Sequence, residues 1–273
     1  MRVVVLAADG MLGTAWTRIL EEHDVALGCF PDVDITRRDS LSLLEGADLV
    51  VNCAAWTDVD GAEAHEEQAA AVNGAAVRVL SEICAAQDAL LVHYSTDYVF
   101  SGDADAPYAV DAPIDPVNAY GRTKALGEIG LVEGGADHIL IRTSWLYAPW
   151  GKNFVRTMAS LGAERDALKV VDDQRGRPTS AQHLAATSLR LVEARVRGTF
   201  HVTDGGECTW YDFAKHIVGR VNPECRVEPC SSDAYPRPAP RPRYSVLDLS
   251  ATEALLGQMP RWETHVDRVL DAL

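Results

Sequence analysis

The sequence lacks any apolar run of the ~18 residues that a transmembrane helix needs. A predicted strand begins at Arg2, which leaves no room for a secretory signal peptide. We therefore expect a cytoplasmic protein with no membrane segment. The 273 residues are 47% hydrophobic and 24% charged, as in ordinary globular proteins. This length allows one large domain, or a domain with a smaller lobe, around a sizeable core.

Cysteine and histidine are present but lack the spacing that metal sites use. The six cysteines form no CxxC pair and several lie in apolar runs, so we expect reduced, buried thiols. The eight histidines show neither HxH nor HExxH spacing. The sequence therefore predicts no zinc site, and we assign no metal.

Basic residues are scarce in the first half of the chain. Residues 1–140 contain 7 Lys and Arg against 24 Asp and Glu, whereas residues 141–273 contain 18 against 16. The net charge of −15 argues against nonspecific nucleic-acid binding. The cations of the second half form two groups, Lys152, Arg156, Arg175 and Arg177, then Arg237, Arg241 and Arg243. Such local charge suits an anionic ligand, although a merely less acidic surface would show the same distribution.

Strand and helix signals alternate through the first 145 residues. Short apolar runs occupy residues 2–7, 24–30, 47–55, 89–95 and 138–147. Helical spacing fills residues 11–22 and the alanine-rich segment 62–87. Apolar strands separated by helices predict a parallel sheet with helices on both faces. The fold class is therefore α/β, a Rossmann-like doubly wound sheet.

The second half has a different pattern. Residues 151–162, 181–194 and 209–221 have helical spacing, and residues 198–203 have the pattern of a short strand. A strand followed by a loop is predicted within residues 167–180. Residues 229–250 are rich in proline and arginine, which predicts an extended loop that wraps over a site.

The stretch AADGMLG, at residues 7–13, follows the first predicted strand and opens the first predicted helix. Its spacing fits Gly-x-x-Gly-x-x-Gly except that Ala7 occupies the first position. Gly10 allows the backbone to approach a pyrophosphate, and Gly13 allows the helix to pack on the sheet. The helix N-terminus favours the phosphates. We predict that Ala7 ends the strand with a negative φ and that the loop binds a dinucleotide. A simple strand-to-helix turn is the alternative reading.

The acidic residue that usually follows about 20 residues later has no clear counterpart. Asp32 and Asp34 come slightly late, and Arg37 and Arg38 begin the next predicted helix. The choice between NADH and NADPH therefore stays open.

Tyr120 and Lys124 stand four residues apart in a helical segment, so they share one face of the helix. A lysine ammonium lowers the pKa of a neighbouring tyrosine by stabilising the phenolate. Tyr120 can then give a proton to a forming alkoxide while a nicotinamide supplies hydride. Thr96 lies at the end of the fourth predicted strand, where ligands bind in doubly wound sheets. Asn73 is expected either to hold a water near Lys124 or to bond nearby backbone.

The motifs STDYVF, YGRTK, NCAAWTDVDGAE, RTSWLY, DDQRGRPTS and RPRYSVLDLS stand in one order along nearly the whole chain. Together they resemble the dTDP-4-dehydrorhamnose reductase family of extended short-chain dehydrogenases/reductases. The resemblance implies reduction of the C4 ketone of a dTDP-4-keto-6-deoxysugar by NADPH or NADH. The product would be dTDP-L-rhamnose or a related deoxysugar of an antibiotic pathway.

The same resemblance implies roles for individual residues. The catalytic residues would be Thr96, Tyr120 and Lys124. The cofactor would be bound by Gly10, Met11, Leu12, Gly13, Asp34, Ile35, Cys53, Ala54, Ala55, Asn73, Tyr120 and Lys124. The substrate would be bound by Thr57, Val59, Thr96, Asp97, Tyr98, Trp145, Asn153, Gln174, Arg175, Thr179, Arg237 and Arg243.

These roles divide the chain into two parts. Residues 1–145 are predicted to form an NAD(P)-binding Rossmann domain, to which the chain returns around residues 180–203. Residues 146–273 are predicted to form mainly a substrate-binding lobe. Some members of the family are dimers with an interfacial magnesium ion. No carboxylate cluster here matches that site, so we expect a monomer or a homodimer without a metal.

Two other functions are compatible with part of the pattern. Nucleotide-sugar epimerases and dehydratases share the fold and the Tyr-x-x-x-Lys motif. Dehydratases place two acidic residues after the threonine, whereas here only Asp97 is acidic and Tyr98 follows it. A relative of the family is a noncatalytic regulatory subunit of a methionine adenosyltransferase. The presence of Thr96, Tyr120 and Lys124 favours the catalytic reading.

Overall fold

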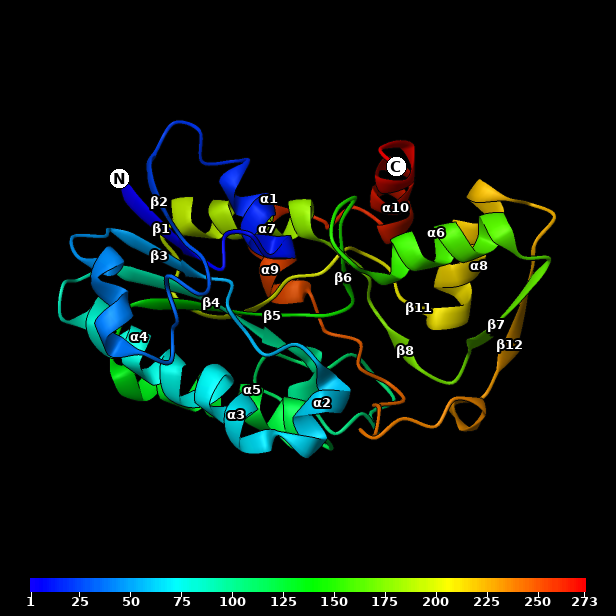
Figure 1. The fold of residues 1–273 in the computed structure, drawn as a ribbon, viewed down its shortest axis with the longest axis horizontal. Coiled ribbons are helices and arrows are strands. Elements are labelled where there is room, and N and C mark those ends of the chain that lie inside the picture. Colours follow the sequence, from blue (N-terminus) through cyan, green and yellow to red (C-terminus); the bar gives the residue numbers. More distant parts are fainter.

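The computed structural model describes residues 1–273 and is built around one parallel sheet of six strands (Figure 1). The strand order is β10-β5-β4-β3-β1-β2, and every neighbouring pair is parallel. The strands are β1 (Arg2–Leu6), β2 (Asp24–Gly28), β3 (Leu49–Asn52), β4 (Leu90–Thr96), β5 (His138–Thr143) and β10 (Gly198–His201). The doubly wound α/β class predicted from the alternation of strands and helices is confirmed.

Helices cover both faces of this sheet (Figure 1). On one face, α1 (Met11–Thr17) packs against α7 (Ala181–Glu193), above a core that includes Trp16 and Leu184. On the other face, α4 (Ala76–Ala85) packs against α5 (Ala119–Gly134), above a core that includes Leu80 and Leu131. Burial on both faces explains why the central strands are apolar throughout rather than alternating.

The chain beyond the sheet forms a second cluster of elements, at the right of Figure 1. Its helices are α6 (Phe154–Glu164), α8 (Trp210–Val221) and α10 (Trp262–Asp271). Its strand pairs are β7 (Ala167–Val171) with β12 (Arg226–Cys230), β8 (Arg175–Gly176) with β11 (Cys208–Thr209), and β6 (Leu146–Tyr147) with β9 (Thr179–Ser180). A separate apolar core, with Phe213 and Ile217 fully buried, holds these elements together. Another helix, α9 (Ser250–Leu256), contacts β10 and α7.

Two predicted elements are interrupted. The strand predicted over 138–147 breaks after Thr143, because Trp145 adopts a φ of 47°, and β6 then pairs with β9. The helix predicted over 62–87 is divided into α2 (Val59–Ala64), α3 (Glu66–Ala70), a π-helical turn (Ala71–Ala75) and α4. His65, at φ −133° and ψ 41°, leaves the helical region and separates α2 from α3. Neither break has a glycine or proline to signal it.

A buried carboxylate links elements of the two parts. Asp204 Oδ1 lies 2.7 Å from His183 Nδ1 and 2.8 Å from His265 Nδ1, and Oδ2 accepts a 2.7 Å hydrogen bond from Tyr147. Burial alone would raise the pKa of Asp204, but the hydrogen bonds from the two histidines hold it below its usual value. No spacing in the sequence indicates this group, because its members are far apart in the chain.

None of the helices combines the length and the apolar character that crossing a bilayer requires. All six cysteines are free, and Cys84, Cys208 and Cys225 are buried.

Candidate active site

The glycine loop between β1 and α1 is a tight turn with one strained residue. Ala7 has a φ of 53°, so the prediction of a negative φ at this position is wrong. Gly10 N donates to the Ala7 carbonyl oxygen at 3.0 Å, which closes a tight turn whose first residue, Ala7, is in the left-handed conformation. For an alanine, that conformation costs about 1–2 kcal/mol. A Cβ atom on Gly13 would lie 2.1 Å from Ala7 O, so only glycine lets α1 pack this closely.

The start of α5 places Tyr120 and Lys124 one turn apart. Asn118 caps the helix, with its side chain accepting a hydrogen bond from Gly121 N at 2.8 Å. A Cβ atom on Gly121 would lie 2.1 Å from Tyr98 O, so glycine is needed where α5 meets the segment after β4. This close approach sets the Tyr120 and Tyr98 rings edge to face, with centroids 6.0 Å apart.

The loop, the end of β4 and the start of α5 surround a cavity of about 550 Å³, here called the reaction cavity. The predicted site residues that line it are Gly10, Met11, Leu12, Cys53, Ala55, Thr57, Val59, Thr96, Asp97, Tyr98, Tyr120, Lys124 and Trp145. Thr96, Tyr120 and Lys124, which the sequence places on two different elements, thus meet at one cavity. The C-terminal strand edge is where doubly wound sheets bind ligands.

Burial dominates the ionisation of the groups in this cavity. Burial lowers the pKa of Lys124 to about 8, and its Nζ donates to the Tyr94 carbonyl oxygen at 2.6 Å. Burial, and then the Asp97 charge, raise the pKa of Tyr120 to about 12, against the lowering effect of the Thr96 hydroxyl. The direction predicted for Tyr120 from its lysine neighbour is therefore reversed in this structure. Here Lys124 Nζ bonds a backbone carbonyl instead of the phenol.

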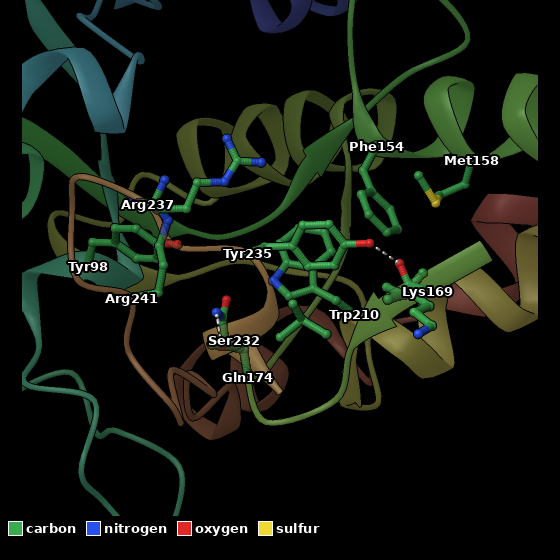
Figure 2. Close-up of a pocket in the computed structure, with 12 residues that line it drawn as sticks. Tyr98, Phe154, Met158, Lys169, Gln174, Trp210, Ser232, Tyr235, Arg237 and Arg241 are labelled. Atoms are coloured by element: carbon green, nitrogen blue, oxygen red, sulfur yellow. Dashed lines mark hydrogen bonds between the residues drawn. The ribbon is translucent and has the colours of Figure 1, made fainter. Parts of the chain in front are cut away.

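A second cavity of about 380 Å³, here called the outer cavity, adjoins the first (Figure 2). Tyr98 and Trp210 line both cavities. The outer cavity has aromatic walls, and Arg237 and Arg241 lie near Tyr98 at one end, as Figure 2 shows. Trp210 also stacks on Trp145, with ring centroids 3.6 Å apart and an interplanar angle of 12°. The two cavities together could accept an extended ligand with an anionic group.

The proline-rich segment 231–249, here called the strap, supplies the two arginines of the outer cavity, Arg237 and Arg241, and β7 adds Lys169. Asp60 Oδ1, on α2, lies 3.0 Å from Arg241 Nη2, and Asp60 Oδ2 lies 3.6 Å from Arg237 Nη1. Asn118 Nδ2 donates to Pro240 O at 2.9 Å. The strap is therefore attached to both α2 and α5, and its Tyr235, Arg237 and Arg241 side chains line the outer cavity.

Comparison with known proteins agrees with this geometry. A family model described as the RmlD substrate binding domain matches residues 1–273. The chain belongs to the RmlD family. The chain is 40% identical to a dTDP-4-dehydrorhamnose reductase of Burkholderia thailandensis, with 97% of each chain covered. It is 41% identical to a dTDP-4-keto-6-deoxy-D-glucose reductase of Streptomyces niveus, with 100% and 97% covered.

A solved structure extends the RmlD likeness to three dimensions. The dTDP-4-dehydrorhamnose reductase of Bacillus anthracis, in complex with NADP, is 35% identical and superposes with a TM-score of 0.95. The alignment covers 100% of this chain and 99% of that chain. The family resemblance identified from the motifs is thereby confirmed.

Several residues expected to bind the cofactor do not line the reaction cavity. The Asn73 side chain accepts a hydrogen bond from Trp56 N at 2.8 Å and donates to Trp56 O and to Thr123. Asn73 therefore bonds nearby backbone, which is one of the two roles expected for it. Ile35 is buried in the core, and Asp34 bonds Thr36. Ala54 packs against that core, and its N donates to Asn52. Gly13 packs α1 against the loop and does not line the cavity.

Only some of the residues expected to bind substrate line one of the two cavities. Gln174 and Arg237 line the outer cavity, and Gln174 donates to Ser232 at 2.7 Å. Arg175 instead pairs with Glu207 at 3.3 Å, and Thr179 is buried in β9. Asn153 caps α6 and lines a separate surface cavity.

Arg243 is exposed and its side chain lines neither cavity, whereas Arg241 lines the outer one. Two arginines of the cluster at 237–243, Arg237 and Arg241, thus line a cavity, and both pair with Asp60, 181 residues before Arg241 in the sequence. Trp210 was also missed, because it lies in an amphipathic segment that looks like ordinary core.

Proposed function

We propose that this chain is an NAD(P)H-dependent reductase of the C4 ketone of a dTDP-4-keto-6-deoxysugar, forming dTDP-L-rhamnose or a related deoxysugar. The observation that carries the proposal is that Thr96, Tyr120 and Lys124 meet in a cavity that continues into a second one lined by arginines. The activities named for relatives at 40% and 41% identity agree with this proposal.

The residues around the glycine loop fit a dinucleotide. Gly10, at the N-cap of α1, has no side chain to bond the first helical N–H groups, and a Cβ atom there would lie 3.1 Å from Ala7 O. Met11 and Leu12, which follow, line the cavity. Backbone N–H groups in such a loop suit a pyrophosphate. The cofactor would supply the hydride when bound.

Tyr120 would supply the proton. Its raised pKa keeps the phenol protonated at neutral pH, so it enters the reaction as an acid. As the ketone oxygen gains negative charge, the phenol donates its proton to that oxygen. Lys124, as an ammonium group fixed by Tyr94 O, stabilises the phenolate that remains. Thr96 orients the ketone by hydrogen bonding to the same oxygen.

The outer cavity would hold the nucleotide part of the substrate. Arg237 and Arg241 provide two guanidinium groups for a diphosphate, which bind such oxygens through charge-assisted hydrogen bonds. Phe154, Trp210 and Tyr235 provide aromatic surface for the base and sugar. The reacting sugar would then extend past Tyr98 into the reaction cavity.

We propose NADPH or NADH as the cofactor. Arg37 and Arg38 follow β2 and are exposed, but they already pair with Asp39 at 2.7 Å and with Glu82 at 3.4 Å. A 2′-phosphate would have to compete with these carboxylates. Asp34, whose pKa is lowered chiefly by the Thr36 hydrogen bonds, adds negative charge at the same place.

We also propose that residues 1–145, with the returning segment 180–203, form the cofactor-binding part. The contact of α7 with α1 and the pairing of β10 with β5 support the return. The rest of 146–273 would form the substrate-binding lobe. The oligomeric state, a monomer or a homodimer, stays a prediction.

The decisive experiment combines the purified protein with dTDP-4-keto-6-deoxy-L-lyxo-hexulose made in situ, and follows NADPH or NADH absorbance. Oxidation that depends on the sugar is expected, and the product should be a dTDP-6-deoxyhexose with an alcohol at C4. No oxidation with either cofactor would overturn the proposal. A dehydratase would instead convert dTDP-glucose to a 4-keto sugar without net loss of reduced cofactor. A noncatalytic subunit would bind the dinucleotide but convert neither the 4-keto sugar nor dTDP-glucose.

A further inference from the structure

Asp97 is a buried carboxyl group that the proton transfer from Tyr120 does not use. It is 2% exposed, directly follows β4 and lines the reaction cavity. Its Oδ1 lies 3.0 Å from Thr96 Oγ1, whereas its Oδ2 has no hydrogen-bond partner. An ionised oxygen left without a partner in such a place is costly.

The hydrogen bonds of Thr96 depend on the charge of this neighbour. Thr96 Oγ1 accepts a hydrogen bond from Tyr98 N at 3.2 Å, and a hydroxyl has only one proton to donate. An ionised Asp97 can only accept, so the 3.0 Å contact then uses the single Thr96 proton. No proton is left for a ketone oxygen. A neutral Asp97 can instead donate to Thr96 Oγ1, which leaves the Thr96 proton free.

We propose that Asp97 is a positioning residue whose neutral carboxyl group donates to Thr96 Oγ1 and so directs the Thr96 proton to the substrate ketone. This inference rests on the proposed reductase function. In the reaction, hydride forms the new C4–H bond, the carbonyl electron pair moves to oxygen, and that oxygen takes the Tyr120 proton. Asp97 keeps its proton, and Thr96 stabilises the developing negative charge as a donor.

The groups around Asp97 allow the neutral form near pH 7. Burial raises the pKa of Asp97 to about 7, although the neighbouring Ser245 and Thr96 hydroxyls oppose this rise. Tyr98 and Tyr120 face it and have raised pKa values, so both are neutral. The cations nearby are Lys124, in the same cavity, and Arg241, which faces Tyr98.

The test is the pH dependence of kcat/KM for the wild type and for Asp97→Asn, whose amide donates to Thr96 at every pH. From about pH 6 to about pH 7.5, wild-type kcat/KM should fall about fourfold as Asp97 ionises, and the variant should change less than about twofold. Asp111→Asn, which removes an exposed charge, should keep the wild-type profile. Dinucleotide binding and thermal unfolding establish that each variant is folded.

Several outcomes would overturn the proposal. If kcat/KM of Asp97→Asn decreases with pH as it does in the wild type, the decrease belongs to another group, such as Lys124. An Asp97→Asn enzyme inactive at every pH but folded would also contradict it. If Asp97→Asn does not fold, Ser245→Ala is the deciding variant. The Ser245 hydroxyl lowers the pKa of Asp97, so its removal should move the decrease in kcat/KM to higher pH. An unchanged pH profile in Ser245→Ala would reject the proposal. A wild type that oxidises no cofactor at any pH rejects the reductase function itself.

Discussion

Arg241 Nη2 and Asp60 Oδ1 lie 3.0 Å apart, and this ion pair joins the strap to α2 at the mouth of the outer cavity. The Arg241 side chain is 19% exposed, so it is held more firmly than the Arg237 side chain, which is 64% exposed. A diphosphate bound in this cavity, as proposed above, would meet one largely buried guanidinium and one exposed guanidinium, both paired with Asp60.

Arg241→Ala should therefore weaken substrate binding more than it slows the chemistry. We expect KM for the dTDP-sugar to rise at least about tenfold, the value of one charge-assisted contact, with kcat within about threefold. Steady-state kinetics with a saturating cofactor measure both constants. Arg243→Ala is the matched control, because Arg243 is exposed and lines neither cavity. An equal rise in KM for both variants would contradict the assignment.

Tyr120→Phe should abolish turnover and leave cofactor binding almost intact. Loss of a positioned general acid lowers kcat by about 10²–10⁴-fold, while the ring still fills its place beside Tyr98. Nicotinamide fluorescence gives the dissociation constant, and the absorbance assay gives kcat. Tyr98→Phe removes a hydroxyl from the same cavity and serves as control. Retained activity in Tyr120→Phe would show that another group supplies the proton.

Lys124→Met should make the protein inactive but more stable. Burial lowers the pKa of Lys124 to about 8. Below that pH, the folded protein buries a charged ammonium group that is solvated by water in the unfolded chain, and this lowers the free energy of unfolding. After the loss of the hydrogen bond to Tyr94 O, we expect a net gain in the free energy of unfolding of about 1–2 kcal/mol at pH 7.

The gain in Lys124→Met should shrink as the pH rises. Between the folded pKa of about 8 and the higher unfolded value, the unfolded wild type binds more protons, so wild-type stability increases with pH. Urea unfolding at about pH 7 and about pH 10 measures both differences. A variant less stable than the wild type at neutral pH would show that Lys124 supports the fold.

Ala7→Gly should stabilise the protein. Glycine relieves the strain of about 1–2 kcal/mol at φ 53°. Against this, the greater freedom of glycine in the unfolded chain lowers the free energy of unfolding by about 0.5–1 kcal/mol. The expected net gain in the free energy of unfolding is about 0.5–1 kcal/mol. Ala8→Gly, in the same loop but without a positive φ, should only destabilise. Equal losses in both variants would mean that Ala7 carries no strain.

The sequence predicts the sheet well, and also the meeting of Thr96, Tyr120 and Lys124 at one cavity, for a physical reason. Thr96 ends a strand and Tyr120 begins a helix, and parallel strands bring such ends to one edge. The angle at Ala7 was predicted wrongly: φ is 53°, and the Ala7 carbonyl oxygen makes such a close contact with α1 that a Cβ atom on Gly13 would lie 2.1 Å from it. That contact depends on how deeply α1 packs, which no local pattern specifies.

The direction of the Tyr120 pKa shift and the contacts of Arg241 could not be predicted from the sequence, for a similar reason. A four-residue spacing puts Lys124 on the same helix face as Tyr120, but the ammonium group bonds to Tyr94 O, a partner contributed by β4. Arg241 depends on Asp60, which lies on α2. In both cases the deciding partner is remote in sequence, so spacing indicates the residue types but not their contacts.

The stacked indoles of Trp145 and Trp210 give the site an optical property of its own. With centroids 3.6 Å apart, their electronic transitions couple, and such coupling produces a paired signal in ultraviolet circular dichroism. Both rings line the reaction cavity, and Trp210 also lines the outer one. A bound sugar nucleotide that tilts either ring changes the coupling. Occupancy of the site can therefore be followed in the unlabelled protein by circular dichroism.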